Sequence, residues 1–326
     1  MAAGVPGTWT LGYQEHGRWG TRNMEAGVPQ GSVLGPVLWN VAFDEVLSLA
    51  EKDERSNIIC YADNTLIIVT GRDLRLTQLR ASLLVARTII LIKRLGLSVA
   101  KEKTEAILFH GKGTVRLPAS IMVEDTSIKF RSSIKYLGVI IDVNWSFFDH
   151  FRYTEEKANK VVRALNRLMP NLRGPDERRR RLFANVVLSV ILYGAPVWGD
   201  VIVKKSCVQP ALYRHQRTIA QRVISAYRTV SNNAALLLAR LPPIKLLATS
   251  RKRTYERIKQ LRNIGNIKAI NKKEIRDSEF TNMCNSWRTI LEKPNTPGEF
   301  TKLFIVPRLE AWLTRDTVNS FSFHLT

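Results

Sequence analysis

Two short apolar runs on either side of a polar pair constrain the fold of this chain most. They lie at residues 58–71, which read IICYADNTLIIVTG. Both runs are rich in β-branched residues, and the Asp63-Asn64 pair between them consists of residue types that tolerate positive φ angles. The pattern predicts a β-hairpin with these two side chains at its tight turn.

The segments around this hairpin alternate between helix and strand. A Gly/Pro-rich turn, GVPQGSVLGP, at 27–36 precedes apolar residues at the spacing of one buried helix face, namely Leu38, Val41, Ala42, Val46 and Leu49. A second helix is predicted from Leu76, Leu79, Leu83, Ala86 and Ile90, and Gly96 is well placed to end it. Two further strands are expected in TEAILFHG (104–111) and IKYLGVIID (134–142). We therefore expect an α+β layer, helices packed on a sheet, up to about residue 145.

The second part of the sequence is predicted to be mostly helical. Apolar residues recur at helical spacing from Phe147 to Leu168, and Pro170 and Gly174 break that helix. Pro175 suits the first turn of a helix over 176–193. Further helices are expected near 204–227, 231–240 and 246–263. The expected domains are a mixed unit, 1–145, and a basic helical unit, 146–326.

The charge of the chain favours a polyanionic partner. It has 326 residues, with 50 Lys and Arg against 28 Asp and Glu, which gives a formal net charge of +22. Such an excess most often serves nucleic-acid binding. Between 201 and 260, thirteen basic residues accompany one acid, Glu256, and we expect this segment to contact phosphate groups. The basic clusters proposed for the nucleic-acid backbone are Arg178, Arg179, Arg180 and Arg251, Lys252, Arg253. The alternative for any single cluster is a solvated helix face.

Cysteine spacing and the hydropathy pattern exclude several protein classes. Cys60, Cys207 and Cys284 lie far apart without CxxC spacing, which argues against a disulfide framework and a zinc module. The N-terminal stretch lacks the pattern of a signal peptide, and the longest apolar stretch, 186–198, is too short to span a bilayer. We expect an intracellular protein, in the nucleus, the cytoplasm or both, without a membrane partner.

Four motifs in a fixed order resemble those of a known family. GVPQGSVLGPVLWN, YADN, KTEAILF and IKYLGVIID are similar to motifs of the reverse transcriptases of non-LTR (LINE-like) retrotransposons of the arthropod type. Downstream, NLRGPDERRRRLFANVVLSVILYGAPVWG and RVISAYRTVS resemble the region after the polymerase core of such elements. The resemblance implies a partial polymerase palm over 1–145 and a thumb-like helical region over 146–326.

The hairpin turn carries the metal site that this resemblance implies. Asp63 matches the first of two adjacent aspartates, and Asn64 stands at the second position, where its amide oxygen can bind Mg²⁺ but brings no charge. The family has a further aspartate on a strand ahead of GVPQG. The residues ahead of GVPQG contain no Asp, and their acids, Glu15 and Glu25, lie in no recognisable strand context. Asp44 follows the turn on a helix face expected to be solvated. The Mg²⁺ site is therefore predicted to be incomplete.

The other roles follow from the resemblance in the same way. The residues that match the nucleotide and template pocket are Gln30, Gly31 and Ser32. Those that match primer contacts are Tyr61, Tyr136, Leu137 and Gly138, although ordinary strand packing explains the last three equally well. Lys103 matches a lysine near the incoming triphosphate, where it would donate a proton to the leaving group; the alternative is a surface lysine.

These observations leave three functions open. The first is an RNA-directed DNA polymerase that uses an RNA template, a DNA primer or target DNA, and dNTPs, with weak or no activity because carboxylates are missing. The second is a catalytically dead remnant that binds RNA or DNA without sequence preference. The third is a helical scaffold for an acidic protein. We also expect the chain to be an internal part of a longer reading frame, whose palm alone would leave a sheet edge unpaired.

Overall fold

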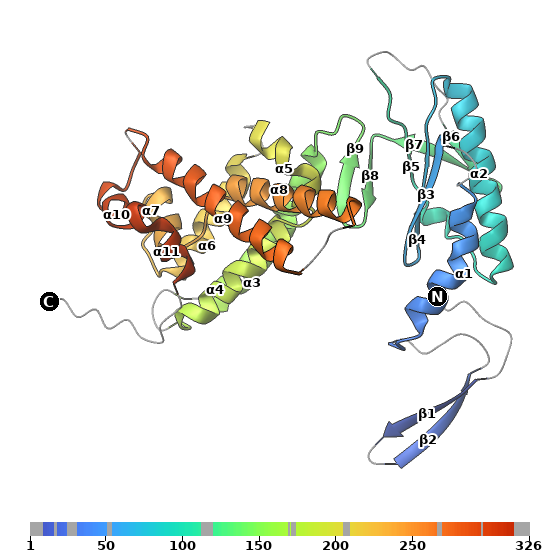
Figure 1. Ribbon diagram of the computed structural model, residues 1–326, viewed down its shortest axis with the longest axis horizontal. Coiled ribbons are helices and arrows are strands. Elements are labelled where there is room, and N and C mark those ends of the chain that lie inside the picture. Colours follow the sequence, from blue (N-terminus) through green and yellow to red (C-terminus); the bar gives the residue numbers. More distant parts are fainter. Residues whose placement is uncertain are drawn as a thin grey trace. The chain divides into compact units, whose positions relative to one another are not determined.

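The chain forms two compact units, residues 1–134 and 135–326, in the computed structural model (Figure 1). The expected boundary lay at residue 145. The difference arises because strand β9 (Val139–Asp142) packs against helix α3 (Phe148–Leu168), and so belongs to the second unit. The structure describes residues 9–15, 18–24, 31–50, 54–111, 120–168, 170, 174–204, 209–265, 269–294 and 296–315.

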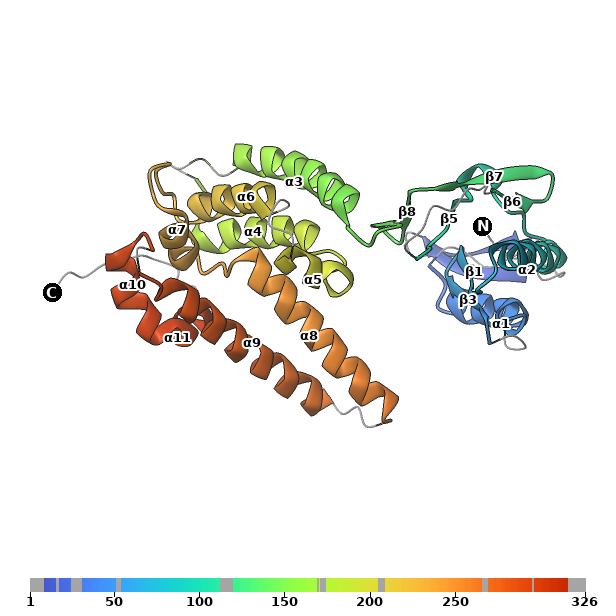
Figure 2. The ribbon, with the colours of Figure 1, turned by 90° about the horizontal axis from the view of Figure 1, so that it is seen from above.

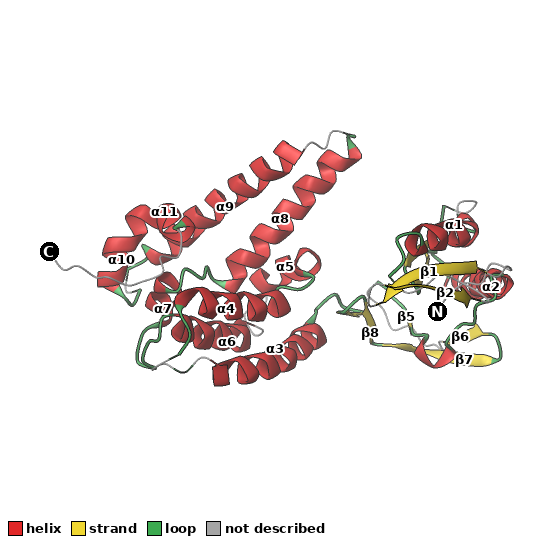
Figure 3. Ribbon diagram, turned by 90° about the horizontal axis from the view of Figure 1, so that it is seen from below, coloured by secondary structure: helices red, strands yellow, loops and turns green. Residues whose placement is uncertain are grey.

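The first unit mixes strands and helices, as expected (Figure 3). Its elements are β1 (Trp9–Glu15), β2 (Arg18–Met24), α1 (Gly35–Ser48), β3 (Ser56–Tyr61), β4 (Asn64–Val69), α2 (Leu74–Arg94), the 3-10 helix η1 (Lys101–Lys103), β5 (Ala106–Ile107), β6 (Ser120–Val123) and β7 (Thr126–Arg131). Strands β1 and β2 pair antiparallel, as do β3 and β4. A small third sheet has the order β5-β7-β6, with β5 parallel and β6 antiparallel to β7.

Two strand expectations need correction. Glu15 does have a strand context, because it ends β1 and pairs with Arg18 at the start of β2. Polar residues and glycines in both strands hide the apolar alternation by which such a hairpin is usually found. The strand expected over 104–111 is limited to Ala106–Ile107.

Sequence signals at the helix ends act as expected. Pro36 stands in the first turn of α1, where its missing N–H costs no hydrogen bond. The Asp73 carboxylate accepts the N–H of Leu76 at 2.7 Å and so caps the start of α2. At the other end, Gly96 adopts a φ of +73° and its N–H donates to the carbonyl of Lys93 at 2.9 Å. The prediction for Gly96 is confirmed.

The buried faces of α1 and α2 differ from the predicted ones. Val41 is 71% exposed and Leu79 is 57% exposed, although both were expected inside. The buried core of this unit consists of Phe43, Val46, Ile58, Leu84, Leu91 and Ile92. Both helices carry apolar residues on more than one face, so a spacing of three and four residues fits several faces. Tertiary packing against β3, β4 and β6 selects among them.

The second unit is a stack of helices that follows one short hairpin. Its elements are β8 (Ser133–Tyr136), β9, α3, α4 (Glu177–Ile191), α5 (Ala195–Lys204), α6 (Gln209–Val223), α7 (Asn232–Leu238), α8 (Ile244–Asn263), α9 (Ala269–Leu291), α10 (Glu299–Ile305), the 3-10 helix η3 (Val306–Arg308) and α11 (Leu309–Thr314). The helices predicted over 176–193, 204–227, 231–240 and 246–263 correspond to α4, α6, α7 and α8, and are confirmed. Helices α8 and α9 lie side by side (Figure 2).

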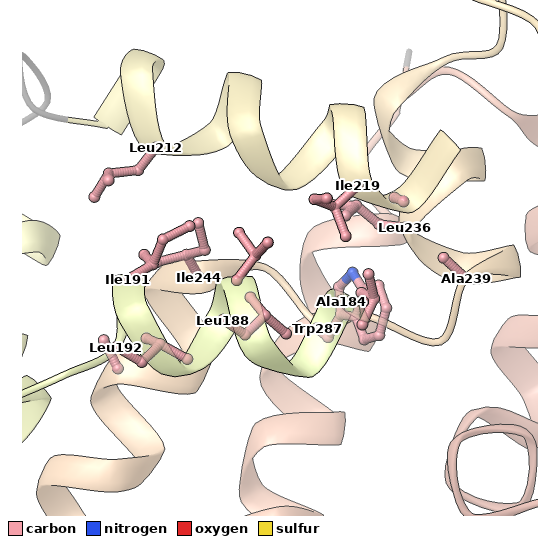
Figure 4. Close-up of a cluster of buried hydrophobic side chains, with 14 of the residues drawn as sticks. Ala184, Leu188, Ile191, Leu192, Leu212, Ile219, Leu236, Ala239, Ile244 and Trp287 are labelled. Carbon is pink, nitrogen blue, oxygen red and sulfur yellow. The ribbon is translucent and has the colours of Figure 1, made fainter. Parts of the chain in front are cut away.

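One continuous core holds the second unit together. Figure 4 shows Leu188 and Ile191 of α4 facing Ile219 of α6. Trp198 and Trp287 are fully buried, at 0% and 1% exposure. Burying a large apolar side chain contributes roughly 1.5–3 kcal/mol, so this core is the main source of stability in the chain. Among the described residues, no single helix is long and apolar enough to cross a membrane; α4 and α5 meet that criterion only as a pair, with a bend of 84° between them.

A buried carboxylate organises the junction between β9 and α3. Asp142 Oδ1 accepts the N–H groups of Asn144 and Ser146, each at 3.0 Å, and its Oδ2 accepts that of Phe147 at 2.6 Å. Burial raises the pKa of Asp142, but these N–H donors together outweigh burial and hold the pKa below its ordinary value. These three hydrogen bonds to Asp142, called the Asp142 clamp below, support two residues with positive φ, Trp145 at +50° and Phe147 at +54°. The Asp142 clamp therefore fixes the loop from which α3 starts.

Candidate functional site

The β3–β4 hairpin presents Asp63 at its tip. The strand pairing ends at Tyr61 and Asn64, so Ala62 and Asp63 form a two-residue turn. The hairpin prediction is confirmed, but the residue with positive φ is Ala62, at +50°. Asn64 is already the first residue of β4 and keeps strand geometry. The side chains of Asp63 and Asn64 are exposed, and Tyr61 is 65% exposed.

A hydrogen bond from helix α1 holds this turn in place. The indole Nε1 of Trp39 donates to the carbonyl oxygen of Ala62 at 3.0 Å. The Trp39 ring stacks on Phe43, with ring centroids 4.4 Å apart and planes at 20°, and Phe43 is buried in the core. Because α1 follows the GVPQGS turn, this one indole connects two motifs that are separate in the sequence. Sequence reasoning missed Trp39; its spacing of four residues from Phe43 was the available signal.

The GVPQGS turn is open on the side of its glycine. Gly31 has a φ of +90°, and apart from its chain neighbours no atom of the described residues lies within 4 Å of the position that a Cβ would take. Glycine is therefore favoured here by the positive φ of the backbone and not by a lack of space for a side chain. The Ser32 hydroxyl oxygen accepts the N–H of Leu34 at 3.3 Å and helps to start α1. Gln30 lies outside the described residues.

The metal donors at the hairpin tip are few. Asp63 Oδ1 accepts a hydrogen bond from Asn64 Nδ2 at 3.4 Å. In the part of the chain that the structure describes, no three His, Cys, Asp or Glu side chains gather where they could hold a metal ion. Lys103 is exposed at the end of η1, and no described ion pair joins it to Asp63. Asp44 is exposed on α1, as expected. The described residues thus bring one carboxylate and one amide to the tip, which does not fit a complete two-metal site.

The residues Tyr136, Leu137 and Gly138 lie at the β8–β9 hairpin of the second unit. Leu137 and Gly138 form its turn, with φ angles of +44° and +83°. The hydroxyl of Tyr193 donates to the carbonyl oxygen of Leu137 at 2.9 Å. A Cβ at Gly138 would lie 2.9 Å from Cε1 of Tyr193, so the glycine lets the ring approach the turn. The stretch predicted as one strand over 134–142 is therefore a hairpin with a tethered turn.

Comparison with known proteins identifies the family. Residues 3–141 match the family model described as reverse transcriptase (RNA-dependent DNA polymerase). Over this region the chain is similar to reverse transcriptases. The match covers the GVPQGS turn, the hairpin with Asp63 and most of the β8–β9 hairpin, so the four ordered motifs lie inside or at the end of the matched region, whereas the two downstream segments lie outside it.

Several relatives of this chain come from insect R1 elements. It is 28% identical over 223 residues to the putative 115 kDa protein in type-1 retrotransposable element R1DM of Drosophila melanogaster, which covers 68% of this chain and 21% of the relative. It is 30% identical over 237 residues to a retrovirus-related Pol polyprotein from element R1 of Bradysia coprophila, over 71% of this chain and 23% of the relative. A corresponding polyprotein of Nasonia vitripennis is 29% identical over 223 residues, over 66% and 65% of the two chains.

These comparisons confirm the resemblance to non-LTR retrotransposon reverse transcriptases of the arthropod type. The matched region spans between about a fifth and two thirds of the length of these curated relatives. No solved structure matches the chain.

One of the predicted basic contacts needs correction. Arg180 is 4% exposed, and its three nitrogens donate to carbonyl oxygens of Pro170, Pro175 and Arg222, each at 2.7 Å. Its guanidinium is therefore committed to the interior and cannot lie on a phosphate-contacting surface. The side chains of Arg178 and Arg179, in contrast, are exposed.

The three members of the second predicted basic cluster, Arg251, Lys252 and Arg253, have different surroundings on α8. Lys252 forms ion pairs with Asp200 and Glu256, so much of its charge is already balanced. Arg253 is exposed. Arg251 donates from Nη1 to the carbonyl oxygen of Leu192 at 3.2 Å and remains exposed. Because consecutive residues point in different directions on a helix, the cluster does not form one basic surface.

Proposed function

We propose that this chain is the nucleic-acid-binding and polymerase-derived part of an R1-type reverse transcriptase, with impaired DNA synthesis. The observation that carries the proposal is the position of Asp63 at an exposed hairpin tip inside the region that matches the family. In this proposal the first unit is a partial palm and the second a thumb-like region. The partners are an RNA template, a DNA primer or target DNA, and dNTPs, and the expected compartment is one with access to nuclear DNA.

The remaining sequence assignments belong to this proposal. Gln30, Gly31 and Ser32 line the nucleotide and template pocket, Lys103 serves the incoming triphosphate, and the primer contacts are Tyr61, Tyr136, Leu137 and Gly138. The positive φ of Gly31 supports a backbone that can approach a ligand closely. Exposure of Tyr61 at the hairpin end leaves its ring available to a primer.

The proposed impairment rests on Asn64. Divalent metal ions, expected to be Mg²⁺, supply charge stabilisation to phosphoryl transfer and are bound by clustered carboxylates. Asn64 offers an uncharged amide at the place of the second carboxylate, and its Nδ2 is turned toward Asp63. Each loss of about 1.4 kcal/mol in transition-state stabilisation slows a reaction tenfold, so the missing charge alone predicts a large reduction.

Primer extension on an RNA template tests the proposal. We expect trace synthesis by the chain as it stands, and an increase of roughly tenfold or more for Asn64→Asp, which changes the charge with little change in shape. Asp63→Ala in the Asn64→Asp background should remove the gain, and it serves as the matched control. Equal rates for the chain and for Asn64→Asp would contradict the proposed impairment.

A second function, binding of nucleic acid without catalysis, is favoured by the basic excess of the helical unit. We propose it as the activity that remains if Asn64→Asp restores no synthesis. Binding should weaken steeply with salt, because cationic side chains release counterions from the nucleic acid. An affinity that is independent of salt concentration would contradict it.

A further inference from the structure

A groove in the second unit is lined by one face of α8, one face of α9, and the end of α4 with the turn that follows it. Its volume is about 790 Å³. The α8 residues that line it, Leu247, Ser250, Arg251, Thr254, Tyr255 and Ile258, recur at steps of three and four residues and so share one helix face. The α9 residues that line it are Arg276, Phe280 and Met283. Figure 2 shows the two helices side by side, with α8 in orange and α9 in red-orange.

The charged side chains that line the groove, among the residues that the structure describes, are those of Arg240, Arg251 and Arg276, so the described lining carries positive charge without an acidic residue. Arg240 is paired with Glu177. No described ion pair or hydrogen bond engages the side chain of Arg276, and Arg251 reaches only the carbonyl oxygen of Leu192. Two guanidinium groups on the groove therefore lack a described carboxylate partner.

The acids near the groove are already paired with other cations. Lys252 of α8 pairs with Asp200 of α5, and Arg257 of α8 pairs with Glu279 of α9, whose Oε1 lies 2.9 Å from Nη1 of the arginine. Lys252 and Arg257 follow Arg251 by one and six positions. Side chains at these spacings point away from the helix face of Arg251, so both ion pairs lie on other faces of α8. The carboxylates are thereby kept from neutralising the groove.

Two exposed tyrosines stand beside these arginines. Tyr193 and Tyr255 both line the groove and are 54% and 52% exposed. The hydroxyl of Tyr193 is held by the carbonyl of Leu137, which fixes the position of its ring. Stacking of an unpaired base on an aromatic ring, next to arginines that bind phosphate, is the combination by which proteins bind single strands. Bases inside a duplex are stacked on each other and are not available in this way.

We infer that this groove binds a single-stranded segment of RNA or DNA, with phosphates at Arg251 and Arg276 and a base on Tyr255. The inference rests on the proposed function and adds to it a specific surface, separate from the Asp63 hairpin. An acidic peptide would satisfy the arginines but makes no use of two exposed aromatic faces, so single-stranded nucleic acid is the better match.

Fluorescence anisotropy with the full chain and a labelled uridine oligonucleotide of about twelve nucleotides tests the inference. The groove variants are Arg276→Gln and Tyr255→Leu, neither of which removes a described hydrogen bond of the side chain. The matched controls are Arg308→Gln and Tyr227→Leu. Arg308 is exposed on η3, and Tyr227 is 82% exposed outside the groove. Circular dichroism verifies that all four variants fold.

We expect roughly tenfold weaker binding for each groove variant and less than twofold change for each control. For Arg276→Gln, the slope of log affinity against log salt should also fall by about 0.7, the value for one contact with a single strand. If the chain binds the oligonucleotide but the groove variants match their controls, the inference is wrong and the proposed function stands. If the chain binds no nucleic acid, both are wrong.

Two further outcomes would overturn the inference alone. One is equal affinity for the oligonucleotide and for a duplex of the same length, lost equally in Tyr255→Leu. The other is loss of poly-glutamate binding in the groove variants without loss of oligonucleotide binding, which would assign the groove to an acidic peptide.

Discussion

Replacing Asp142 with alanine should destabilise the helical unit by about 3–6 kcal/mol. A hydrogen bond from a backbone N–H to an ionised carboxylate contributes about 1.5–3 kcal/mol, and Asp142 accepts three of them. Water can replace the carboxylate at Asn144, which is exposed, but not at Phe147, which is 1% exposed. The estimate therefore counts the bonds of Ser146 and Phe147 and leaves the third to solvent.

The measurement is urea unfolding of the full chain, followed by helix circular dichroism at neutral pH. The free energy of unfolding of Asp142→Asn should lie between those of the unsubstituted protein and Asp142→Ala, because the amide oxygen of asparagine still accepts a hydrogen bond. The control is Asp277→Ala, which removes an exposed carboxylate from α9. If Asp142→Ala and Asp277→Ala unfold at the same urea concentration, the clamp does not stabilise the α3 junction.

The same carboxylate predicts acid sensitivity of a defined sign. Its pKa in the folded chain lies below the ordinary value of 3.8. The stabilisation is therefore complete above the unfolded pKa and is lost as the pH falls through the lower folded pKa. Asp142→Asn should lack this part of the acid transition.

Three further predictions concern single contacts. Trp39→Phe should lower the free energy of local opening of the β3–β4 turn, measured by hydrogen exchange, by about 1 kcal/mol. The change removes the indole donor to the carbonyl of Ala62 and keeps an aromatic ring on the core. Arg180→Met should lower the stability to thermal unfolding by about 3–5 kcal/mol, because three carbonyls lose their donor. Burial lowers the pKa of His150 to about 4, so stability should fall by roughly 3 kcal/mol as the pH drops from 6.5 toward that value, and His150→Gln should remove this dependence.

Each of these predictions has an outcome that contradicts it. Unchanged exchange in β3 and β4 would show that the Trp39 bond does not hold the turn. Arg179→Met, at the exposed neighbouring position, is the control for Arg180→Met, and equal melting temperatures for the two would refute the interior role. A stability profile for His150→Gln that still declines between pH 6.5 and 4 would assign that decline to another group.

The helix ends of this chain could be predicted because they depend on local chemistry. Pro170 and Gly174 separate α3 from α4 as predicted, whereas Pro175 precedes the cap Asp176 and does not stand in the first turn of α4; the Asp176 carboxylate accepts the N–H of Arg179 at 2.9 Å. Gly96 ends α2 by its positive φ. Such capping signals depend only on residues within one helical turn, so they can be recognised in the sequence without knowledge of the tertiary structure.

Predictions that depend on tertiary packing were less accurate. In the run of arginines from 178 to 181, Arg180 lies four residues before the buried Ala184 and seven before the buried Val187. That spacing was a signal that this arginine points inward, but composition alone treats all the members of the run alike. The groove could not be predicted, because Tyr193, Arg251 and Arg276 come from segments far apart in the sequence. Of these only Arg251 was a candidate.

The difference in size between the hydrophobic cores of the two units predicts the order in which they unfold on heating. The first unit is held by a small cluster that includes Phe43 and Ile58, whereas the second unit has a continuous core around Trp198 and Trp287. Local opening occurs first where few apolar contacts must be broken. Heat should therefore open the hairpin that carries Asp63 before it unfolds the helices of the second unit.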